Sequence, residues 1–210
     1  MRLAAFAFGE LVEASATLES LGEARSGRAR HAYVEIVLTA IASAGGRELE
    51  TVGDGVLAVF GSPSDALSFA SSVQRGCERE SRRSSERLDV RVGIDVGETT
   101  ADDGSDERGV SAAVRARQLA RAADSGSVLA SGVVAALAAG VDARFSPIGL
   151  LELPGAQEPV SAFEVVWERP AVEQVSLPAE LERGVPRTSF VGREAEQERL
   201  QAVWRLALGG

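Results

Sequence analysis

Lysine is absent from this sequence, and all 22 of its basic residues are arginine. Cysteine and histidine occur once each, as Cys77 and His31. A single cysteine excludes an intrachain disulfide and a cysteine-cluster metal site, and its place in a helical stretch predicts a packed thiol. His31 stands among arginines on a predicted helix, so neither a histidine metal cluster nor a Ser-His-Asp triad is indicated.

Long hydrophobic runs are also missing. The longest, such as VLAVF, fall far short of the ~20 residues of a membrane-spanning helix, and no basic region leads into an apolar signal segment. We therefore expect a cytoplasmic protein without a membrane partner. The formal net charge of −9 argues against nucleic acid as a partner, because phosphate binding normally concentrates basic residues on one face.

The apolar residues that are present suffice for a core. A 210-residue chain with 45% hydrophobic residues predicts one domain of about 150 residues plus additional sequence. Alternation and helical spacing predict strands at 2–8, 47–52, 56–60, 88–100, 127–131, 144–153 and 161–168, and helices at 11–43, 62–83, 110–123 and 132–139. A break near RSGR indicates either two helices or one bent helix within 11–43. Hairpins mixed with helical crossovers favour an α/β (α+β) fold: a ferredoxin-like two-layer sandwich with a mixed sheet flanked by helices.

The sequence changes in character at Pro170. Residues 170–188 contain three prolines and scattered charge, which predicts a linker. Residues 189–210 begin a new amphipathic helix that cannot bury its apolar face alone. We expect a domain at 1–169, a linker at 170–188, and a terminal helix at 189–210.

A carboxylate stands at the tip of the hairpin predicted at 47–60. The turn is Gly53-Asp54-Gly55, between two strands that look buried. Gly-Asp-Gly is a common turn because Asp tolerates the backbone angles required, so Asp54 has a purely structural interpretation. A rigid turn also suits a carboxylate that ligates a metal.

Four separated blocks resemble class III nucleotidyl cyclase domains in order and spacing. They are ETVGDGVLAVF, RVGIDVGET, DERGVSAAVRARQLARAADSGSVLAS and GLLELPGAQEPVSAFEV, and the resemblance covers roughly residues 1–168. It implies a head-to-tail homodimer that converts a purine nucleoside triphosphate to its 3′,5′-cyclic monophosphate in clefts between subunits. Two carboxylates of one subunit would hold Mg²⁺ or Mn²⁺, and the partner would supply purine-reading residues, an Asn and an Arg for the transition state, and a phosphate-binding Lys.

The resemblance assigns the metal ligands to Asp54 and Glu10. Asp54 matches the hairpin carboxylate of the family, whereas Glu10 stands where the family has Asp. The longer Glu side chain shifts its oxygens by about an ångström in a site that demands near-octahedral geometry. Glu13 and Ala14 replace the small residues that let the backbone approach phosphate. Glu10 also has a simpler interpretation, as a solvated charge at a strand end.

The remaining positions depart further from the family. Glu50 and Asp106 take the purine-reading positions, and Glu50 favours guanine. Arg117 matches the transition-state Arg, but Ala113 stands where the family has Asn. An alternative for Arg117 is a merely exposed charged helix face shared with neighbouring arginines. Pro154 occupies the position of the phosphate-binding Lys and offers neither a charge nor a backbone donor.

The segment FVGREAEQERL, at 190–200, resembles the opening of signal-transduction ATPase domains that often follow a cyclase domain. Their phosphate-binding loop requires a Gly-Lys pair, and the sequence has no lysine. We therefore expect this chain to be the N-terminal piece of a longer ATPase regulator.

Two functions from different classes follow. The first is a degenerate cyclase homology domain that serves as a dimerising or nucleotide-sensing regulatory module of a signalling protein. The alternative is an active but weak cyclase, a phosphorus–oxygen lyase making cAMP or cGMP from ATP or GTP with two divalent metals. A domain retained only as a dimerisation spacer is a third interpretation.

Overall fold

The fold is built around strand β1 (Arg2–Leu11), which is buried on both faces. Ala4, Phe6 and Phe8 pack on one side of the sheet, and Ala5 and Ala7 pack on the other. Alternating side chains of a strand point to opposite faces, so this run of small and aromatic residues supplies two cores at once. The computed structural model describes residues 2–12, 23–84, 87–100, 107–138, 143–154 and 158–167.

Seven strands within the described residues form one mixed sheet in the order β2-β3-β1-β4-β5-β7-β6. Only the β4–β5 pair is parallel, and the other pairs are antiparallel. The remaining elements are α2 (Glu23–Ser43), β2 (Arg47–Val52), β3 (Gly55–Phe60), α3 (Pro63–Arg83), β4 (Val90–Thr99), α4 (Glu107–Ala122), β5 (Val128–Ser131), α5 (Gly132–Leu137), β6 (Arg144–Leu151) and β7 (Val160–Val166).

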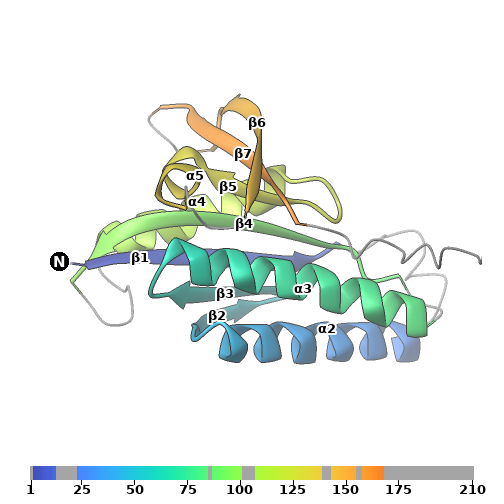
Figure 1. Cartoon of the computed structure of the whole chain (residues 1–210). Coiled ribbons are helices and arrows are strands. Elements are labelled where there is room, and N and C mark those ends of the chain that lie inside the picture. Colours follow the sequence, from blue (N-terminus) through green and yellow to red (C-terminus); the bar gives the residue numbers. More distant parts are fainter. Residues whose placement is uncertain are drawn as a thin grey trace, which may run out of the picture. The chain divides into compact units, whose positions relative to one another are not determined.

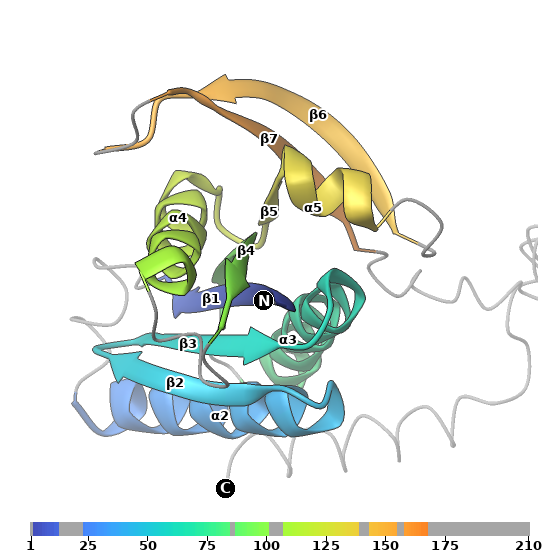
Figure 2. The ribbon, with the colours of Figure 1, turned by 90° about the vertical axis from the view of Figure 1, so that its left-hand side faces the viewer.

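The helices cover both faces of this sheet. Helices α2 and α3 lie side by side along one face (Figure 1), where their apolar residues join the larger core. Figure 2 shows α4 on the opposite side of β1 and β4 from α3. Gly93 of β4 lets α4 approach closely, because a Cβ at this position would stand 2.0 Å from the carbonyl oxygen of Ala116. This contact sets the distance between α4 and the sheet, and it therefore also positions the arginines on the surface of α4.

Within the described residues, the predicted order of elements and the mixed sheet are confirmed. Of the helix predicted at 11–43, the part from Glu23 is observed, and residues 13–22 lie outside the described residues. Strand β1 runs to Leu11, three residues beyond the prediction, and α4 begins at Glu107, three residues before it. Ser62 caps α3 as the Ser-Pro pair predicts, with its Oγ accepting from the backbone N–H of Asp65 at 3.2 Å. Cys77 is buried, as predicted for a packed thiol.

One expectation about the hairpin is wrong. Strand β3 is buried throughout, but β2 is largely exposed because it is an edge strand of the sheet. A bulge between Glu48 and Glu50 interrupts its pairing with β3.

No helix in the described stretches is both long and apolar enough to cross a membrane.

Candidate functional site

The β2–β3 turn holds Asp54 in a fixed position. Gly53 has a positive φ of +59°, which matches a two-residue type II′ hairpin turn with glycine first. Gly55 lies directly on the ring of Phe8, since a Cβ there would stand 2.2 Å from Cζ of that ring. The backbone N–H of Leu11 donates to the carbonyl oxygen of Asp54 at 3.1 Å. The two glycines are therefore required by the turn and by its packing on β1.

The register of the sheet brings the two predicted metal carboxylates to one edge. Glu10 of β1 is paired with Gly55 on one side and with Arg91 of β4 on the other. Asp54 precedes Gly55, so both carboxylates belong to the same end of neighbouring strands. The structure thus brings Glu10 and Asp54 together, as the sequence predicts for a shared site.

Both carboxylates line a cleft of about 410 Å³. Three arginines also face it: Arg91 from β4, and Arg117 and Arg121 from successive turns of α4. The full lining is Phe8, Glu10, Leu11, Val12, Val52, Gly53, Asp54, Arg91, Arg117 and Arg121. The cleft combines two carboxylates with three guanidinium groups, a composition suited to a phosphorylated ligand.

Each carboxylate in the cleft is already paired. Arg91 donates to Oε2 of Glu10 from Nε at 2.9 Å, and its second nitrogen lies 2.7 Å from the same oxygen. Arg30 of α2 donates from Nε to Oδ1 of Asp54 and from its terminal nitrogen to Oδ2 at 3.2 Å. The Arg30 pair is bidentate, the stronger arrangement for a guanidinium and a carboxylate.

Arg117 is also paired within the chain. It donates to Oε2 of Glu50 and lies over the ring of Phe8, 5.3 Å from its centroid. Its side chain is only 27% exposed. Neighbouring Arg115 donates to the buried carboxylate of Asp95 at 2.5 Å. The alternative of a merely exposed charged face is therefore wrong for these two residues.

Ala113 and Pro154 stand where the resemblance expects an Asn and a Lys, and neither side chain can donate a hydrogen bond. Ala113 is half-buried on α4 and packs against the smaller core. Pro154 is exposed, and its carbonyl oxygen accepts from Nε2 of Gln118 on α4. Asp106, Glu13 and Ala14 lie outside the described residues, as do the linker and the terminal helix predicted at 170–210.

A buried tyrosine lies beneath the carboxylates. The hydroxyl of Tyr33, on α2, stands 3.4 Å from where a Cβ of Gly9 would be. It has no hydrogen-bond partner within the part of the chain that the structure describes. Burial raises the pKa of Tyr33 well above 10.0, and the negative charges of Cys77, Glu10 and Asp54 raise it further. Tyr33 is thus a neutral donor beside the two carboxylates.

The donor set of this cleft fits a divalent cation that shares its ligands with a phosphorylated molecule. Carboxylate oxygens suit Mg²⁺ and Mn²⁺, and Mg²⁺ is commonly held by one or two carboxylates together with substrate phosphates. Glu10 and Asp54 supply such a pair. Across the described ranges, no group of three or more acidic, histidine or cysteine side chains is arranged to hold a metal by itself.

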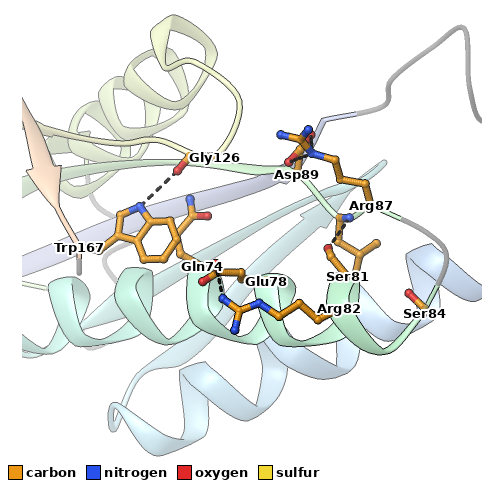
Figure 3. A pocket seen from close by; sticks show the side chains of 10 residues that line it. Gln74, Glu78, Ser81, Arg82, Ser84, Arg87, Asp89, Gly126 and Trp167 are labelled. Atoms are coloured by element: carbon orange, nitrogen blue, oxygen red, sulfur yellow. Dashed lines mark hydrogen bonds and ion pairs between the residues drawn. The ribbon is translucent and has the colours of Figure 1, made fainter. Parts of the chain in front are cut away.

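A second hollow, of about 400 Å³, lies beside the C-terminal half of α3 (Figure 3). Several of its polar groups are paired with one another, although Oε2 of Glu78 is buried without a partner among the described residues. Arg82 pairs with Glu78 at 2.6 Å, and Arg87 pairs with Asp89 at 2.8 Å. The indole N–H of Trp167 donates to the carbonyl oxygen of Gly126 at 3.2 Å. The hollow contains none of the site residues predicted from the sequence.

Sequence reasoning missed Arg30 and Arg91 as parts of the site. Arg91 lies within the block RVGIDVGET, and the antiparallel register of β1 and β4 would have placed it opposite Glu10. Arg30 carries no such signal, because its contact with Asp54 depends on how α2 packs across the sheet. Arg121 was visible only as one arginine of a charged helix.

No family model matches the sequence, and no curated protein matches it. Among solved structures, 139 chains match. An adenylate/guanylate cyclase/hydrolase from Silicibacter pomeroyi shares 27% identity, with a TM-score of 0.63 over 79% of this chain and 96% of that one. The adenylyl cyclase CyaB from P. aeruginosa shares 19%, with a TM-score of 0.63 over 80% and 96%. The guanylate cyclase domain of RhGC from Catenaria anguillulae, solved with GTP, shares 14%, with a TM-score of 0.60 over 78% and 96%. The structural neighbours are class III adenylate and guanylate cyclase domains, and this chain has their fold.

Proposed function

We propose that this domain binds a purine nucleoside triphosphate in the cleft at Glu10 and Asp54 and acts as a dimerising, nucleotide-sensing module of a signalling protein. In this proposal it has little or no cyclase turnover. The neighbours' fold supports a nucleotidyl cyclase homology domain. The composition of the cleft supports nucleotide binding, and the pairing of its charged groups supports weak catalysis.

One observation carries the proposal: the charged groups that catalysis would need are neutralised inside the chain. Glu10 is paired with Arg91, and Asp54 with Arg30. Arg117, which would stabilise the transition state, is paired with Glu50. A cyclase needs these carboxylates for cations and this guanidinium for developing negative charge, so each pair opposes turnover.

Two missing donors add to this deficit. Ala113 replaces the transition-state Asn, and Pro154 replaces the phosphate-binding Lys. Removing one well-placed electrostatic donor costs roughly 10²–10³ in rate, although effects within one site do not simply add. The loss of both donors reduces turnover far more than it reduces binding, because the guanidinium groups of the cleft remain.

Binding requires fewer of the family's features. The three arginines of the cleft can donate to phosphate oxygens once a nucleotide competes with Glu10 for Arg91 and with Glu50 for Arg117. When bound, divalent cations at Glu10 and Asp54 would neutralise the triphosphate and lower the pKa of the ribose 3′-hydroxyl. Glu50 is 52% exposed and its carboxylate can accept N–H groups of guanine, which favours GTP.

Exposed apolar side chains support a dimer at this face. Val110 and Val114 lie one turn apart on α4, the turn before Arg117, and are 50% and 46% exposed. Val52, next to the Asp54 turn, is 50% exposed. Apolar groups on both sides of the cleft are what a second copy would bury. Among the neighbours, one guanylyl cyclase domain is described as a non-canonical dimer, and trypanosomal adenylate cyclases are described in a monomeric state.

Calorimetry tests the proposal directly. The purified chain is titrated with non-hydrolysable ATP and GTP analogues in the presence of Mn²⁺, and sedimentation velocity is run with and without them. We expect binding that weakens about 3- to 10-fold in an Arg121→Gln variant, since one charge-assisted phosphate contact is removed. Dimerisation without any nucleotide affinity would favour the spacer interpretation instead.

A weak cyclase remains the second candidate function. The observation that favours it is the guanidinium of Arg121, the third in the cleft. Arg121 lies one helical turn from Arg117 and lines the same cleft. Arg121 can supply to phosphate the charge that Pro154 lacks. Cyclic nucleotide formation that is lost in both Asp54→Ala and Arg121→Gln variants would establish this candidate.

A further inference from the structure

The Arg30–Asp54 contact ties helix α2 to the carboxylate turn. Arg30 offers two N–H groups to the two oxygens of Asp54, so each oxygen already has a cationic donor. The carboxylate side chain is 18% exposed, whereas that of Arg30 is 50% exposed. The fixed partner is therefore Asp54, on a rigid turn, and the partner that can turn into solvent is Arg30.

A divalent cation cannot approach Asp54 while this pair is intact. Mg²⁺ binds carboxylate oxygen at 2.0–2.1 Å and Mn²⁺ prefers the same oxygen ligands, and both would then stand within a few ångströms of a guanidinium. Two positive charges at such a separation repel each other strongly at the edge of a protein. Metal binding at Asp54 thus requires Arg30 to leave.

Tyr33 is a second polar group close to this pair. It lies three residues after Arg30 on the same helix, so the two residues are neighbours on its surface. Its hydroxyl is buried without a hydrogen-bond partner among the described residues, next to Glu10 and Asp54. Buried hydroxyl groups are nearly always hydrogen-bonded, so this donor is available to a ligand or water that enters beside the carboxylates.

We infer that Arg30 is an internal counter-cation that competes with divalent metal for Asp54 and sets the metal concentration at which the cleft becomes able to hold a nucleotide. This inference rests on the proposed function, since it takes Asp54 as a metal ligand. Arg30 acts here as a gate on helix α2, and it lies outside the four blocks that resemble the cyclases. Movement of α2 would then be coupled to metal occupancy.

The test measures metal binding alone, without nucleotide or turnover. Free Mn²⁺ is followed by electron paramagnetic resonance during titration of the wild-type chain and of Arg30→Gln, Asp54→Asn and the double variant. We expect Arg30→Gln to bind Mn²⁺ about 3- to 10-fold more tightly than wild type, the range expected for loss of a partly exposed ion pair and its charge. The gain should vanish when Asp54→Asn is added, because the two residues act on one cation.

Arg83→Gln is the matched control. It removes the same charge from α3 at a side chain that is 82% exposed, and it should leave Mn²⁺ affinity unchanged. Circular dichroism confirms that each variant is folded, and Mn²⁺ should raise the melting temperature of Arg30→Gln more than that of wild type.

Three results would overturn the inference: equal Mn²⁺ affinity in wild type and Arg30→Gln, a gain that persists in the double variant, or no Mn²⁺ binding in any variant. A separate nucleotide titration tells the two proposals apart. If Arg30→Gln binds Mn²⁺ more tightly than wild type but no variant binds nucleotide, the proposed function fails and the role of Arg30 stands. If nucleotide binds while Arg30→Gln changes nothing, only the role of Arg30 fails.

Discussion

The guanidinium of Arg117 pairs with the carboxylate of Glu50 while it lies over the ring of Phe8. The partners come from α4 and from the exposed edge strand β2, and they meet beside the bulge at Glu48–Glu50. Two residues to which we propose different tasks, reading the purine and stabilising charge, thus hold each other. A nucleotide has to compete with this pair for both of them.

Releasing Arg117 should change nucleotide selectivity. In Glu50→Gln the ion pair and the carboxylate that favours guanine are both lost, so we expect ATP to bind about 2- to 5-fold more tightly relative to GTP. Competition against a fluorescent nucleotide measures the ratio. Glu48→Gln, on the same exposed strand, is the control and should leave it unchanged. An identical ratio in Glu50→Gln and wild type would remove Glu50 from the site.

A larger side chain at Gly93, where α4 packs closely on β4, should destabilise the fold. Gly93→Ala places a Cβ 2.0 Å from a backbone oxygen, and we expect it to lower the free energy of unfolding by at least about 2 kcal/mol. Gly27→Ala is the control, because nothing lies within 4 Å of a Cβ there and alanine favours the helix by about 0.5–1 kcal/mol. Urea denaturation compares the two. A Gly93→Ala variant as stable as wild type would contradict the packing of α4 described above.

Removal of the Tyr33 hydroxyl should stabilise the fold. An unpaired buried polar group costs about 1–3 kcal/mol, so Tyr33→Phe is expected to raise the free energy of unfolding by about 1 kcal/mol. Chemical denaturation in the absence of metal measures this change. A Phe variant that is less stable than wild type would show that the hydroxyl is hydrogen-bonded in the metal-free chain.

Stability should fall in alkali as buried protons are lost. Burial, and to a smaller extent the charge of Asp89, raises the pKa of Cys77 from 9.0 to about 12. The unfolded chain therefore loses this proton first, so the contribution of Cys77 is complete below pH 9 and disappears as the pH rises from 9 toward 12. Tyr33 shifts in the same direction. We expect the urea midpoint to fall as the pH rises from 9 toward 12, and to fall less in Cys77→Ala. Equal slopes in both chains would contradict a buried, protonated thiol.

The strands of the sheet and the turn that carries Asp54 could be predicted from the sequence, because each is encoded by a short run of neighbouring residues. Alternation located β1 and β4, and Gly53-Asp54-Gly55 located the turn that carries Asp54. Once these strands pair, Glu10 and Asp54 must lie at the same edge. The resemblance in four blocks gave the arrangement of helices between them.

The pairing of the charged groups did not follow, because it depends on contacts between distant elements. Arg30 contacts Asp54 only because α2 packs across the sheet. Arg117 contacts Glu50 only because α4 packs closely against β4 at Gly93. The exposure of β2 was missed for a similar reason: its alternation is the same at an edge as at the centre, and its position in the sheet decides which faces are covered.

Product formation decides between a nucleotide sensor and an enzyme. The purified chain is incubated with Mn²⁺ and either ATP or GTP at concentrations that calorimetry shows to be saturating, and cyclic nucleotide is quantified by mass spectrometry beside an Asp54→Ala variant. We predict bound nucleotide with no cyclic product above the Asp54→Ala background. Clear formation of cAMP or cGMP that disappears in Asp54→Ala would contradict this, and would show that the ion pairs of the cleft open to give a working cyclase.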